Sequence, residues 1–566
     1  MNRQARLDRL TQTPAVTVLI IGGGINGIAT FRDLALQGID VLLVDRADFC
    51  SGASAASSHM AHGGIRYLEN GEFRLVREAV EERNRLITNA PHYVSPLPTV
   101  IPIFRRLSGL LNAPLKFLGV LDRPAERGAA IIKLGLLMYD AYTGTERTVP
   151  RHEFLSRRAA LRRYPQLNPA IVGAAEYYDG LIRAPERLCM ELIADAEAAS
   201  PTAHALNYVS VVGAANGQVR LRDEVSGETW DVRPQVVINA AGPWIDLTNL
   251  ALGKPTRLIG GTKGSHLVLD HRELRQAIGE HEFFFENQDG RIVLICPLAE
   301  RVLVGTSDIR IDNPDEAICT DDEIEYFLGM IARVFPSIHV DRSQIVFTFS
   351  GVRPLPAADA KSTGQISRDH SIEVIEPAGD TSFPILNLVG GKWTTFRAFA
   401  EQTADQALAR LGRSRQTSTA TVAIGGGKAY PRTPQARAQW LAQQATQTNL
   451  AARWVEILFA RYGTLAAAIM ADIATQRLEH ADQPLQHQAD YLRGEVAYLA
   501  YTEKVIHLDD FILRRSSLAM LGMVTLPLLE ELATLIGATC GWSAVERQAE
   551  LEQTQKRLTE RHGVRL

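Results

Sequence analysis

The chain has 566 residues, 46% of them hydrophobic and 22% charged, which is enough for two or three globular domains with substantial cores. Its formal net charge of -4 gives no general attraction to nucleic acid, so we expect no nucleic-acid partner. The cysteines are Cys50, Cys189, Cys296, Cys319 and Cys540. They have no C-x-x-C or metal-ligand spacing, which predicts no metal site and favours reduced core thiols in a cytosolic protein.

Neither the first fifteen residues nor the hydropathy of the chain indicates a signal peptide or a membrane span. The first fifteen residues include Arg3, Arg6 and Arg9 but no apolar segment separate from the first predicted strand, so we expect no signal peptide. No run reaches the roughly 18 apolar residues that a spanning helix needs.

A βαβ unit is predicted near the N-terminus. The β-branched run Val16–Ile21 has the pattern of a buried parallel strand, and a second run, Val41–Val44, ends in Asp45. Between the runs lie three glycines in the G-x-G-x-x-G spacing: Gly22, Gly24 and Gly27. Apolar residues at helical spacing follow, and Gly38 is a suitable helix end.

The residue types of this unit suit a dinucleotide. Gly22 allows a tight turn, Gly24 lets the backbone approach a pyrophosphate at the positive end of the helix, and Gly27 lets helix and strand pack closely. Asp45 can accept hydrogen bonds from an adenosine ribose, and its charge disfavours a 2′-phosphate. A purely structural glycine turn is the alternative, but strand, helix, second strand and acid together favour dinucleotide binding.

The sequence also indicates where the electrons come from. It has one G-x-G-x-x-G after a strand, whereas flavoproteins that use NAD(P)H usually carry a second nucleotide-binding unit. This favours a flavin dehydrogenase or oxidase that its substrate reduces directly.

Four cations follow or adjoin glycine-rich turns or strand ends, where side chains can project into a cleft: Arg66, Arg353, Arg368 and Lys392. Arg matches phosphate oxygens bidentately and Lys adds a point charge, so we expect an anionic substrate. Surface charges or structural ion pairs are the alternative.

The stretch Pro96–Tyr142 mixes leucines with Arg105, Arg106 and Lys116, a composition that suits a helix lying in a membrane interface. A pair of substrate-domain helices with an ordinary buried face is the alternative.

Later segments predict a return to the nucleotide domain and then a substrate sheet. Strands at Val209–Val212, Val219–Leu221 and from Val236 suit the nucleotide domain, and residues 258–349 are β-rich. After Ile385 come a strand, a Gly-Gly turn and a helix for which Thr394 and Thr395 are the expected caps.

The end of the chain is predicted to be helical. Four charged residues stand out there: Asp509, Asp510, Arg514 and Arg515. We expect them to form ion pairs within and between domains, with a binding site as the alternative.

Seven motifs follow one another along the chain: GGGINGIA, ASSHMAHGGIRYLE, INAAGPW, KGSH, FSGVRPL, ISRD and GGKWTTFR. In this order they closely resemble FAD-dependent glycerol-3-phosphate dehydrogenases of the aerobic, quinone-linked kind, over nearly the whole chain. HGGIRYLE and GVRPL are more specific than the glycine fingerprint. The resemblance implies FAD as cofactor, sn-glycerol 3-phosphate as substrate, dihydroxyacetone phosphate as product and a quinone as acceptor, in glycerol catabolism.

The resemblance also implies the binding residues. The implied cofactor contacts are Gly22, Gly24, Asn26, Gly27, Asp45, Ser57, Ser58, Gly63, Gly64, Gly242 and Gly391. The implied contacts to the phosphate and hydroxyls of the substrate are Arg66, Tyr67, Arg353, Arg368 and Lys392.

In the implied reaction the C2 hydrogen leaves as hydride while the C2 hydroxyl loses a proton, so a base or cation must assist. We expect Arg353 and Lys392 to stabilise the developing alkoxide. His62 and His266 are both candidate bases, because neutral imidazole accepts a proton near pH 7. A histidine that only makes structural hydrogen bonds is the alternative for each.

Two residues depart from the family pattern, which usually has Lys at the position of His59 and Leu at that of Trp393. They leave open a dehydrogenase for erythritol phosphate or another polyol phosphate. An oxidase that uses dioxygen and a non-catalytic FAD-binding scaffold also stay open.

We expect an α/β protein with a glutathione-reductase-like FAD-binding Rossmann domain, an interleaved β-rich substrate domain and an all-α C-terminal domain. The expected segments are 16–95, 170–257 and 345–411 for FAD binding, 96–169 and 258–344 for the substrate domain, 412–435 for a linker and 436–566 for the helical domain. The resemblance implies a peripheral protein on the inner face of the cytoplasmic membrane and allows a homodimer.

Overall fold

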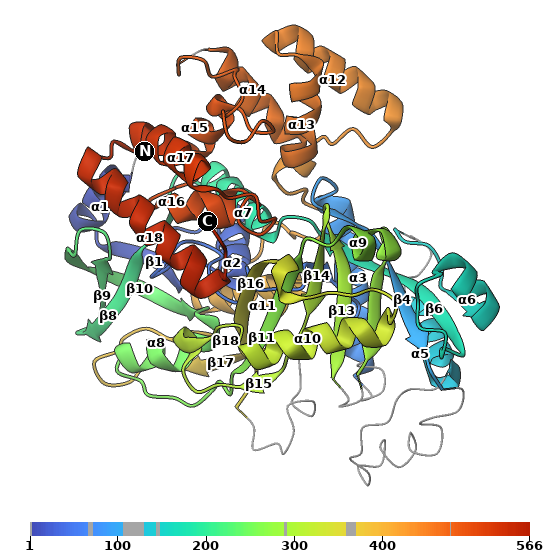
Figure 1. Cartoon of the computed structure of the whole chain (residues 1–566). Helices are drawn as coiled ribbons and strands as arrows, with labels where there is room; N and C mark the ends of the chain where they lie inside the picture. The colour runs from blue at the N-terminus through green and yellow to red at the C-terminus, as the bar shows by residue number, and fades with distance from the viewer. Residues whose placement is uncertain are drawn as a thin grey trace.

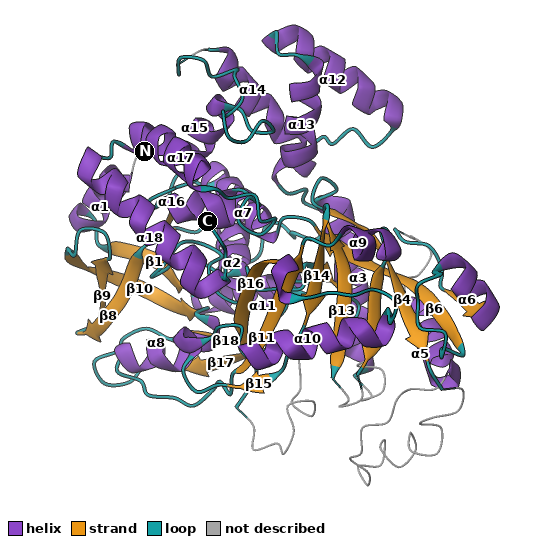
Figure 2. Ribbon diagram, in the orientation of Figure 1, coloured by secondary structure: helices purple, strands orange, loops and turns teal. Residues whose placement is uncertain are grey.

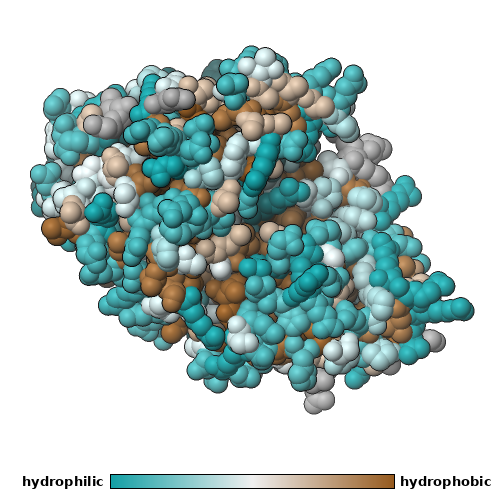
Figure 3. Space-filling model, turned by 45° about the horizontal axis from the view of Figure 1, so that its top comes forward, coloured by the Kyte–Doolittle hydropathy of each residue, from teal (hydrophilic) through white to brown (hydrophobic). Residues whose placement is uncertain are grey.

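The computed structural model describes residues 3–65, 72–105, 129–142, 148–287, 291–357, 369–475 and 477–566. It contains two β-sheets, both built from alternating segments of the chain, with helices packed around them and a helical C-terminal region (Figures 1 and 2). On the face drawn in Figure 3, hydrophilic residues predominate and hydrophobic residues form groups between them.

The first sheet has eight strands within the described residues, in the order β17-β18-β10-β1-β2-β7, with β9 on β10 and β8 on β9. From β18 to β7 neighbouring strands are parallel. The strands are β1 (Ala15–Ile21), β2 (Val41–Val44), β7 (Ala203–Leu206), β8 (Val209–Ala215), β9 (Gln218–Asp223), β10 (Thr229–Asn239), β17 (Ser371–Ile375) and β18 (Ile385–Val389).

Strand β1 is buried on both faces, as its continuous apolar run predicts. Val18 and Ile20 belong to a core shared with helices α2 (Ile25–Leu36), α7 (Pro185–Ala199) and α11 (Phe396–Arg410). Leu19 and Ile21 belong to a second core, shared with β8, β9 and helix α1 (Arg3–Gln12). The predicted βαβ unit is confirmed, and it forms the centre of a three-layer nucleotide-binding domain.

The larger sheet has ten strands within the described residues, in the order β15-β11-β14-β13-β12-β4-β6-β3, with β16 on β11 and β5 on β6. The strands are β3 (Met60–Ala61), β4 (Val94–Ile103), β5 (Glu153–Ser156), β6 (Gly173–Ile182), β11 (Thr262–Leu269), β12 (Glu282–Glu286), β13 (Ile292–Leu298), β14 (Arg301–Gly305), β15 (Ile309–Arg310) and β16 (Ile345–Arg353). This confirms the β-rich prediction for 258–349.

Alternate residues of the larger sheet face different cores. Leu267 and Leu269 pack with helices α6 (Arg157–Arg163), α9 (Arg272–Ile278) and α10 (Asp321–Val334). Val268, between them, belongs to a core that is shared with the C-terminal helices. The C-terminal region therefore covers one face of the larger sheet.

Besides the two-residue strand β3, two strands lie in a different sheet from the one that the expected segments suggest. Strands β6 and β16 belong to the larger sheet, although residues from 170 and from 345 were expected in the FAD-binding part. Each of the two lies at the start of an expected FAD-binding segment. Long-range pairing of β6 with β4 and of β16 with β11 decides the sheet to which they belong.

The interface-helix prediction for Pro96–Tyr142 is wrong for its first part, which is strand β4. Its prolines occupy alternate positions: Pro96, Pro98 and Pro102. The Ile103 carbonyl accepts a hydrogen bond from Val172 N on the β6 side, so the even-numbered prolines direct their missing N–H groups to the other side, where β12 pairs at Thr99 and Val100. A strand can therefore tolerate all three. Residues 106–128 lie outside the described residues, and helix α5 (Ala129–Tyr142) follows them.

The C-terminal region is helical, as predicted, and its main helices are α12 (Pro434–Thr448), α13 (Ala452–Tyr462), α14 (Ala466–Ala474), α15 (Arg493–Thr502), α16 (Leu508–Asp510), α17 (Leu526–Cys540) and α18 (Ala544–His562). Helices α3 (Phe73–Asn89) and α8 (Ile245–Ala251) lie in the part of the chain before residue 411.

The segment predicted as a linker is anchored to the nucleotide domain. Gly425–Gly427 is buried, and the backbone N–H groups of Gly425 and Gly426 donate to Asp195 and Glu191 of α7 at 3.2 and 3.0 Å.

Within the described residues, Ala452–Ala474 has the length and hydropathy of a membrane span, with 44% of the window buried. The structure breaks it at Gly463, where α13 ends and a 3₁₀ turn (Gly463–Leu465) leads to α14. Helices α13 and α14 pack against each other in the core of the C-terminal region. Core packing accounts for the apolar composition of this segment.

The cysteines form no disulfide among the described residues. Cys50, Cys189 and Cys296 are buried, which confirms the prediction of core thiols for these three.

Candidate active site

The glycine loop joins the carboxyl end of β1 to the N-terminus of α2. Gly22 has φ +112°, and a Cβ at this position would lie 2.5 Å from the Ala240 carbonyl oxygen. A Cβ on Gly27 would overlap the Gly22 carbonyl oxygen, so helix and loop can pack this closely only with glycine at both positions. The end of β10, predicted as another point of close backbone approach, thus forms one wall of the loop.

Asp45 lies at the end of β2 beside the glycine loop. Its Oδ2 accepts from the Gly23 N–H at 2.6 Å and its Oδ1 from the Ala47 N–H at 2.8 Å. Burial raises the pKa of Asp45 to about 6, against the effect of these two hydrogen bonds. A carboxylate has about four lone-pair sites, so acceptor capacity remains for the ribose hydroxyls.

The small-residue segment 51–58 lies across the start of α2. Ser54 Oγ accepts from the Ile25 N–H at 3.0 Å, and the Ser54 carbonyl accepts from the Trp393 indole at 2.9 Å. Gly351 of β16 lies against this segment, since a Cβ there would lie 2.6 Å from Ala56 Cβ. The sequence reasoning noted the small residues but missed Ser54, whose only signal was its place in that run.

The backbone of Gly63 is held by a buried cluster. Its N–H lies 2.9 Å from Asp179 Oδ1 and 2.9 Å from the Tyr139 hydroxyl, which also donates to Asp179. Arg83 is fully buried, donates to the Tyr139 hydroxyl at 2.8 Å and pairs with Asp179 at 3.5 Å. The sequence reasoning missed all three side chains, because each stands alone in a helix or strand far from the glycine.

The turn between β18 and α11 contacts the start of α2 and the segment 54–64. Gly391 has φ +93°, and its Cβ would overlap the Asn26 side chain at the start of α2. Thr394 Oγ1 accepts from the His62 N–H at 3.0 Å. Half-buried Lys392 lies within electrostatic reach of Glu78 on α3.

The predicted capping of α11 is wrong in its detail. Thr395 is the N-cap residue but makes no side-chain cap hydrogen bond, and Thr394 bonds the backbone of His62 instead. The tertiary contact competes with the local cap for the threonine hydroxyl.

Arg353, at the end of β16, has an oriented guanidinium. It donates to Thr306 Oγ1 at 2.9 Å and to the Ser307 carbonyl at 3.1 Å, and it pairs with Asp308 at 3.2 Å. A Cβ on Gly264 would overlap the guanidinium, so the glycine of KGSH makes room for it.

The Ser307 side chain is fixed by a hydrogen bond to a buried ion pair. Its Oγ donates to Glu323 Oε1 at 2.5 Å, and Glu323 Oε2 pairs with Lys263 at 2.8 Å. Ser265 also donates to Glu323 at 2.8 Å. These hydrogen bonds fix the loop that holds Arg353.

The two candidate histidines differ in their surroundings. The His266 ring is stacked on Phe349 with centroids 4.7 Å apart, and its Nε2 lies 2.9 Å from Ser58 Oγ. Burial and the nearby Arg353 lower the pKa of His266 to about 3. His62 is half-buried, and its backbone is fixed by Thr394.

The two departures from the family pattern lie near this site. His59 is buried with φ +58°, and burial lowers its pKa to about 4. Trp393 is also buried and donates to the Ser54 carbonyl, so it braces the small-residue segment.

The structure therefore brings together the glycine loop, Asp45, the segment 54–64, Gly391 and Lys392, with Arg353 next to His266. Gly64 and Gly242 have positive φ, of +72° and +58°, at the ends of their segments. Ser57 accepts from the His59 N–H at 3.3 Å. Arg66, Tyr67 and Arg368 lie outside the described residues.

The observed cradle fits the diphosphate and adenosine ribose of FAD. The glycine loop has no room for side chains, and Asn26 Oδ1 is buried without a hydrogen-bond partner among the described residues. The N-terminus of α2 supplies backbone N–H groups and a positive dipole end for phosphate. The Asp45 carboxylate has acceptor capacity for the ribose.

Comparison with known proteins agrees with this geometry. Residues 17–406 match the family model described as "FAD dependent oxidoreductase", so the chain is an FAD-dependent oxidoreductase and its cofactor is FAD. Residues 417–547 match the model of the "C-terminal domain of alpha-glycerophosphate oxidase". A Synechocystis protein named glycerol-3-phosphate dehydrogenase is 33% identical, over 96% of each chain. The chain belongs to the family of FAD-dependent glycerol-3-phosphate dehydrogenases.

A mouse mitochondrial glycerol-3-phosphate dehydrogenase is 29% identical, over 97% of this chain and 74% of its own length. Two solved structures support the fold. The glycerol-3-phosphate dehydrogenase from Bacillus halodurans complexed with FAD has a TM-score of 0.75 at 22% identity, covering 99% of this chain and 98% of its own. The FAD-bound L-alpha-glycerophosphate oxidase from Mycoplasma pneumoniae has a TM-score of 0.50 at 18% identity, over 72% of this chain and 98% of its own. The expected fold class is confirmed.

Proposed function

We propose that this protein oxidises sn-glycerol 3-phosphate at C2 to dihydroxyacetone phosphate and passes the electrons to a quinone. The observation that carries the proposal is the identity of 33% over 96% of both chains to the Synechocystis glycerol-3-phosphate dehydrogenase. Arg353 and Lys392, at the borders of the FAD cradle, are the described cations that suit a phosphate or a developing alkoxide.

The residues around the cradle have different roles in the proposed reaction. FAD supplies a two-electron acceptor for the hydride from C2. The oriented fork of Arg353 and the ammonium of Lys392 bind substrate oxygens and stabilise negative charge as the C2 hydroxyl loses its proton. His62 takes that proton in this proposal, because the pKa of about 3 makes His266 a weak base at neutral pH. His266 instead holds Ser58, which the family resemblance places beside the flavin.

Turnover with a soluble ubiquinone analogue tests the substrate and the acceptor together. The parallel substrates are sn-glycerol 3-phosphate, erythritol 4-phosphate and glycerol. We expect quinone reduction with glycerol 3-phosphate, weak activity with erythritol 4-phosphate and none with glycerol, which lacks the phosphate. If none of the three compounds is turned over, the result would favour the non-catalytic scaffold.

An oxidase is the second candidate, because residues 417–547 match the C-terminal domain of alpha-glycerophosphate oxidase. Hydrogen peroxide formation in air distinguishes the two. Peroxide in amounts equal to the substrate consumed, with no benefit from added quinone, would identify an oxidase.

A polyol-phosphate dehydrogenase for erythritol phosphate remains the third candidate. His59 and Trp393 are buried, and Trp393 braces the segment behind the FAD cradle. This contact gives Trp393 a structural role, which supports glycerol 3-phosphate as the substrate. Faster turnover with erythritol 4-phosphate would reverse the choice.

We place the protein at the inner face of the cytoplasmic membrane, where a quinone acceptor is dissolved, with α5 as a contact. One face of α5 is buried through Ile132, Leu136 and Tyr139, whereas Leu134 and Leu137 are 62% and 51% exposed. Burying exposed leucines of this kind in a lipid interface lowers the free energy of the system, which favours membrane binding.

Flotation with anionic phospholipid vesicles tests this contact. We expect the double variant Leu134→Ser/Leu137→Ser to bind vesicles less than the native chain. The control Leu247→Ser/Leu250→Ser removes equally exposed leucines from α8, 53% and 59% exposed, and should bind as the native chain does. Equal binding by both double variants would contradict a contact through α5.

A further inference from the structure

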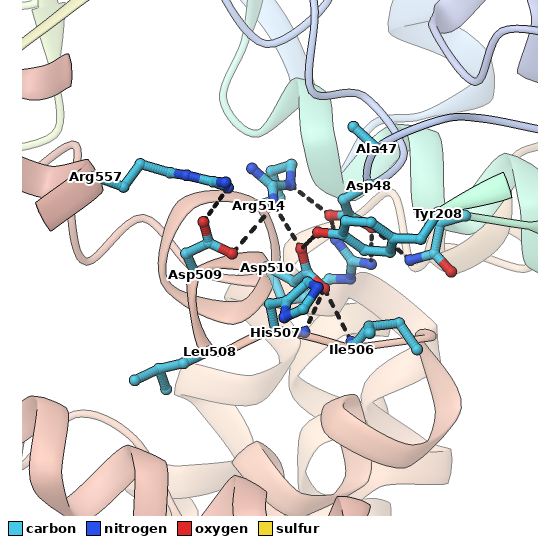
Figure 4. Close-up of polar contacts among 12 residues, drawn as sticks. Ala47, Asp48, Tyr208, Ile506, His507, Leu508, Asp509, Asp510, Arg514 and Arg557 are labelled. Carbon is cyan, nitrogen blue, oxygen red and sulfur yellow. Dashed lines mark hydrogen bonds and ion pairs between the residues drawn. The ribbon is translucent and has the colours of Figure 1, made fainter. Parts of the chain in front are cut away.

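The four charged residues that the sequence singled out near the C-terminus meet the nucleotide domain at Asp48. Arg515 binds the Asp48 carboxylate with both Nη atoms, at 2.7 and 2.9 Å. Arg514 Nε also donates to Asp48 (Figure 4). Asp48 and Arg515 are 0% and 1% exposed. The ion-pair prediction for these residues is confirmed.

A second layer of contacts extends the network on the C-terminal side. Asp510 accepts from Arg514 at 2.6 Å and from the Tyr208 hydroxyl at 2.5 Å (Figure 4). Asp509 pairs with Arg557 of α18. The pKa of Asp48 is held below its ordinary value, because the attraction of Arg515 and Arg514 outweighs its burial.

Asp48 stands three residues after Asp45, the residue that we expect to accept hydrogen bonds from the adenosine ribose. The intervening backbone is docked on the connection between β7 and β8. Val209 N donates to the Asp45 carbonyl at 2.7 Å, and Tyr208 N donates to the Ala47 carbonyl at 3.0 Å. Tyr208 therefore touches the loop through its backbone and the C-terminal network through its hydroxyl.

The 45–48 loop is thus held at both ends. Asp45 is bonded to the glycine loop, and Asp48 is bonded to two arginines of the C-terminal region. A buried bidentate ion pair has one well-defined geometry, so it fixes the position of the backbone that carries it.

We propose that Arg514 and Arg515 are FAD-positioning residues that act through Asp48. They keep the 45–48 loop, and with it the Asp45 carboxylate, in the geometry that accepts the adenosine ribose. The C-terminal region thereby sets the affinity of the nucleotide domain for the adenosine half of FAD. The proposal does not depend on which substrate the protein oxidises.

The test compares Arg515→Lys with a matched variant, Arg461→Lys. Lys keeps the charge but loses the bidentate fork. Arg461 makes a similar two-oxygen pair with Glu495, at 2.9 and 3.2 Å, inside the C-terminal region. FAD binding to the flavin-free protein is followed by the quenching of flavin fluorescence, and ADP competes for the adenosine half of the site.

We expect Arg515→Lys to raise the dissociation constants of FAD and of ADP by about tenfold each, the range for a lost charged hydrogen bond. Arg461→Lys should leave both within about twofold of the native values. An unchanged FAD constant in Arg515→Lys, the same rise in Arg461→Lys, or a rise for FAD without one for ADP would overturn the proposal.

Tyr208→Phe gives an answer if Arg515→Lys does not fold. It deletes only the hydroxyl that reaches Asp510 and leaves the backbone contact to Ala47 in place. We expect a smaller rise in both constants, of about threefold. If Arg515→Lys does not fold, and a folded Tyr208→Phe has the native dissociation constants for FAD and ADP, the proposal is overturned.

Discussion

Asp45 is buried at the end of β2, and two backbone N–H groups already bond its carboxylate. Because the pKa of the FAD-free residue is raised to about 6, the carboxyl is mostly charged at pH 7 and mostly protonated at pH 5. Ribose hydroxyls donate to the charged form and lower its pKa on binding. FAD binding below pH 6 must therefore displace a proton.

The first prediction follows from this linkage. The dissociation constant of FAD should be nearly constant above pH 7 and rise below about pH 6, by up to about tenfold per pH unit. Fluorescence titrations at several pH values measure it. Asp45→Asn, which cannot titrate, should bind more weakly at pH 7 and lose the rise between pH 6 and 5. A flat profile in the native protein would contradict this role of Asp45.

The second prediction separates the two histidines. His62→Asn should slow flavin reduction by substrate by about 10²- to 10⁴-fold, the usual contribution of a general base. His266→Asn should slow it by less than about tenfold, because its low pKa and its bond to Ser58 indicate a positioning role. Anaerobic stopped-flow measurements at matched flavin content give both rates, and the reverse order would assign the base to His266.

At the scale of elements, the turn between β18 and α11 connects the distant parts of the site. It meets α2 through Gly391 and Asn26, and it meets the segment 54–64 through Thr394 and Trp393. A local pattern predicted the strand, the Gly-Gly turn and the helix. The contacts of Thr394 and Trp393 are between residues more than 300 positions apart, so local reasoning could not find them.

The third prediction compares two glycines of similar backbone conformation. Gly391→Ala and Gly412→Ala both place a Cβ at positive φ, of +93° and +63°, which costs about 1 kcal/mol. The Cβ at Gly391 meets Asn26, whereas that at Gly412 meets nothing within 4 Å. We expect Gly391→Ala to purify with little FAD and Gly412→Ala with a full complement. Equal flavin content would show that the turn does not shape the cradle.

Strand β4 shows where composition misleads. Its alternating prolines and apolar residues suit a strand as well as an interface segment, and only the pairing with β6 and β12 distinguishes the two. The β1-α2-β2 unit could be predicted because its signal is local: an apolar run, glycines at fixed spacing, a helix and an acid.

At the scale of the whole molecule, the FAD site is assembled from segments spread from β1 to α11. The sequence and its family resemblance were sufficient for the fold class, the cofactor and the glycine loop. The buried supports of the site, such as Asp179 behind Gly63 and Glu323 behind Ser307, were not predicted. Single charged residues in helices and strands give no local signal for such tertiary contacts. The C-terminal helices share a core with the larger sheet and ion pairs with the 45–48 loop, so this region supports both halves of the site.

An anaerobic titration of the purified, flavin-loaded protein with sn-glycerol 3-phosphate tests the central claim most directly. We predict that the visible absorption band of the flavin bleaches with glycerol 3-phosphate, in proportion to the substrate added, and stays unchanged with glycerol. A band that glycerol 3-phosphate does not bleach, in protein that carries its full FAD, would contradict the proposed oxidation of glycerol 3-phosphate.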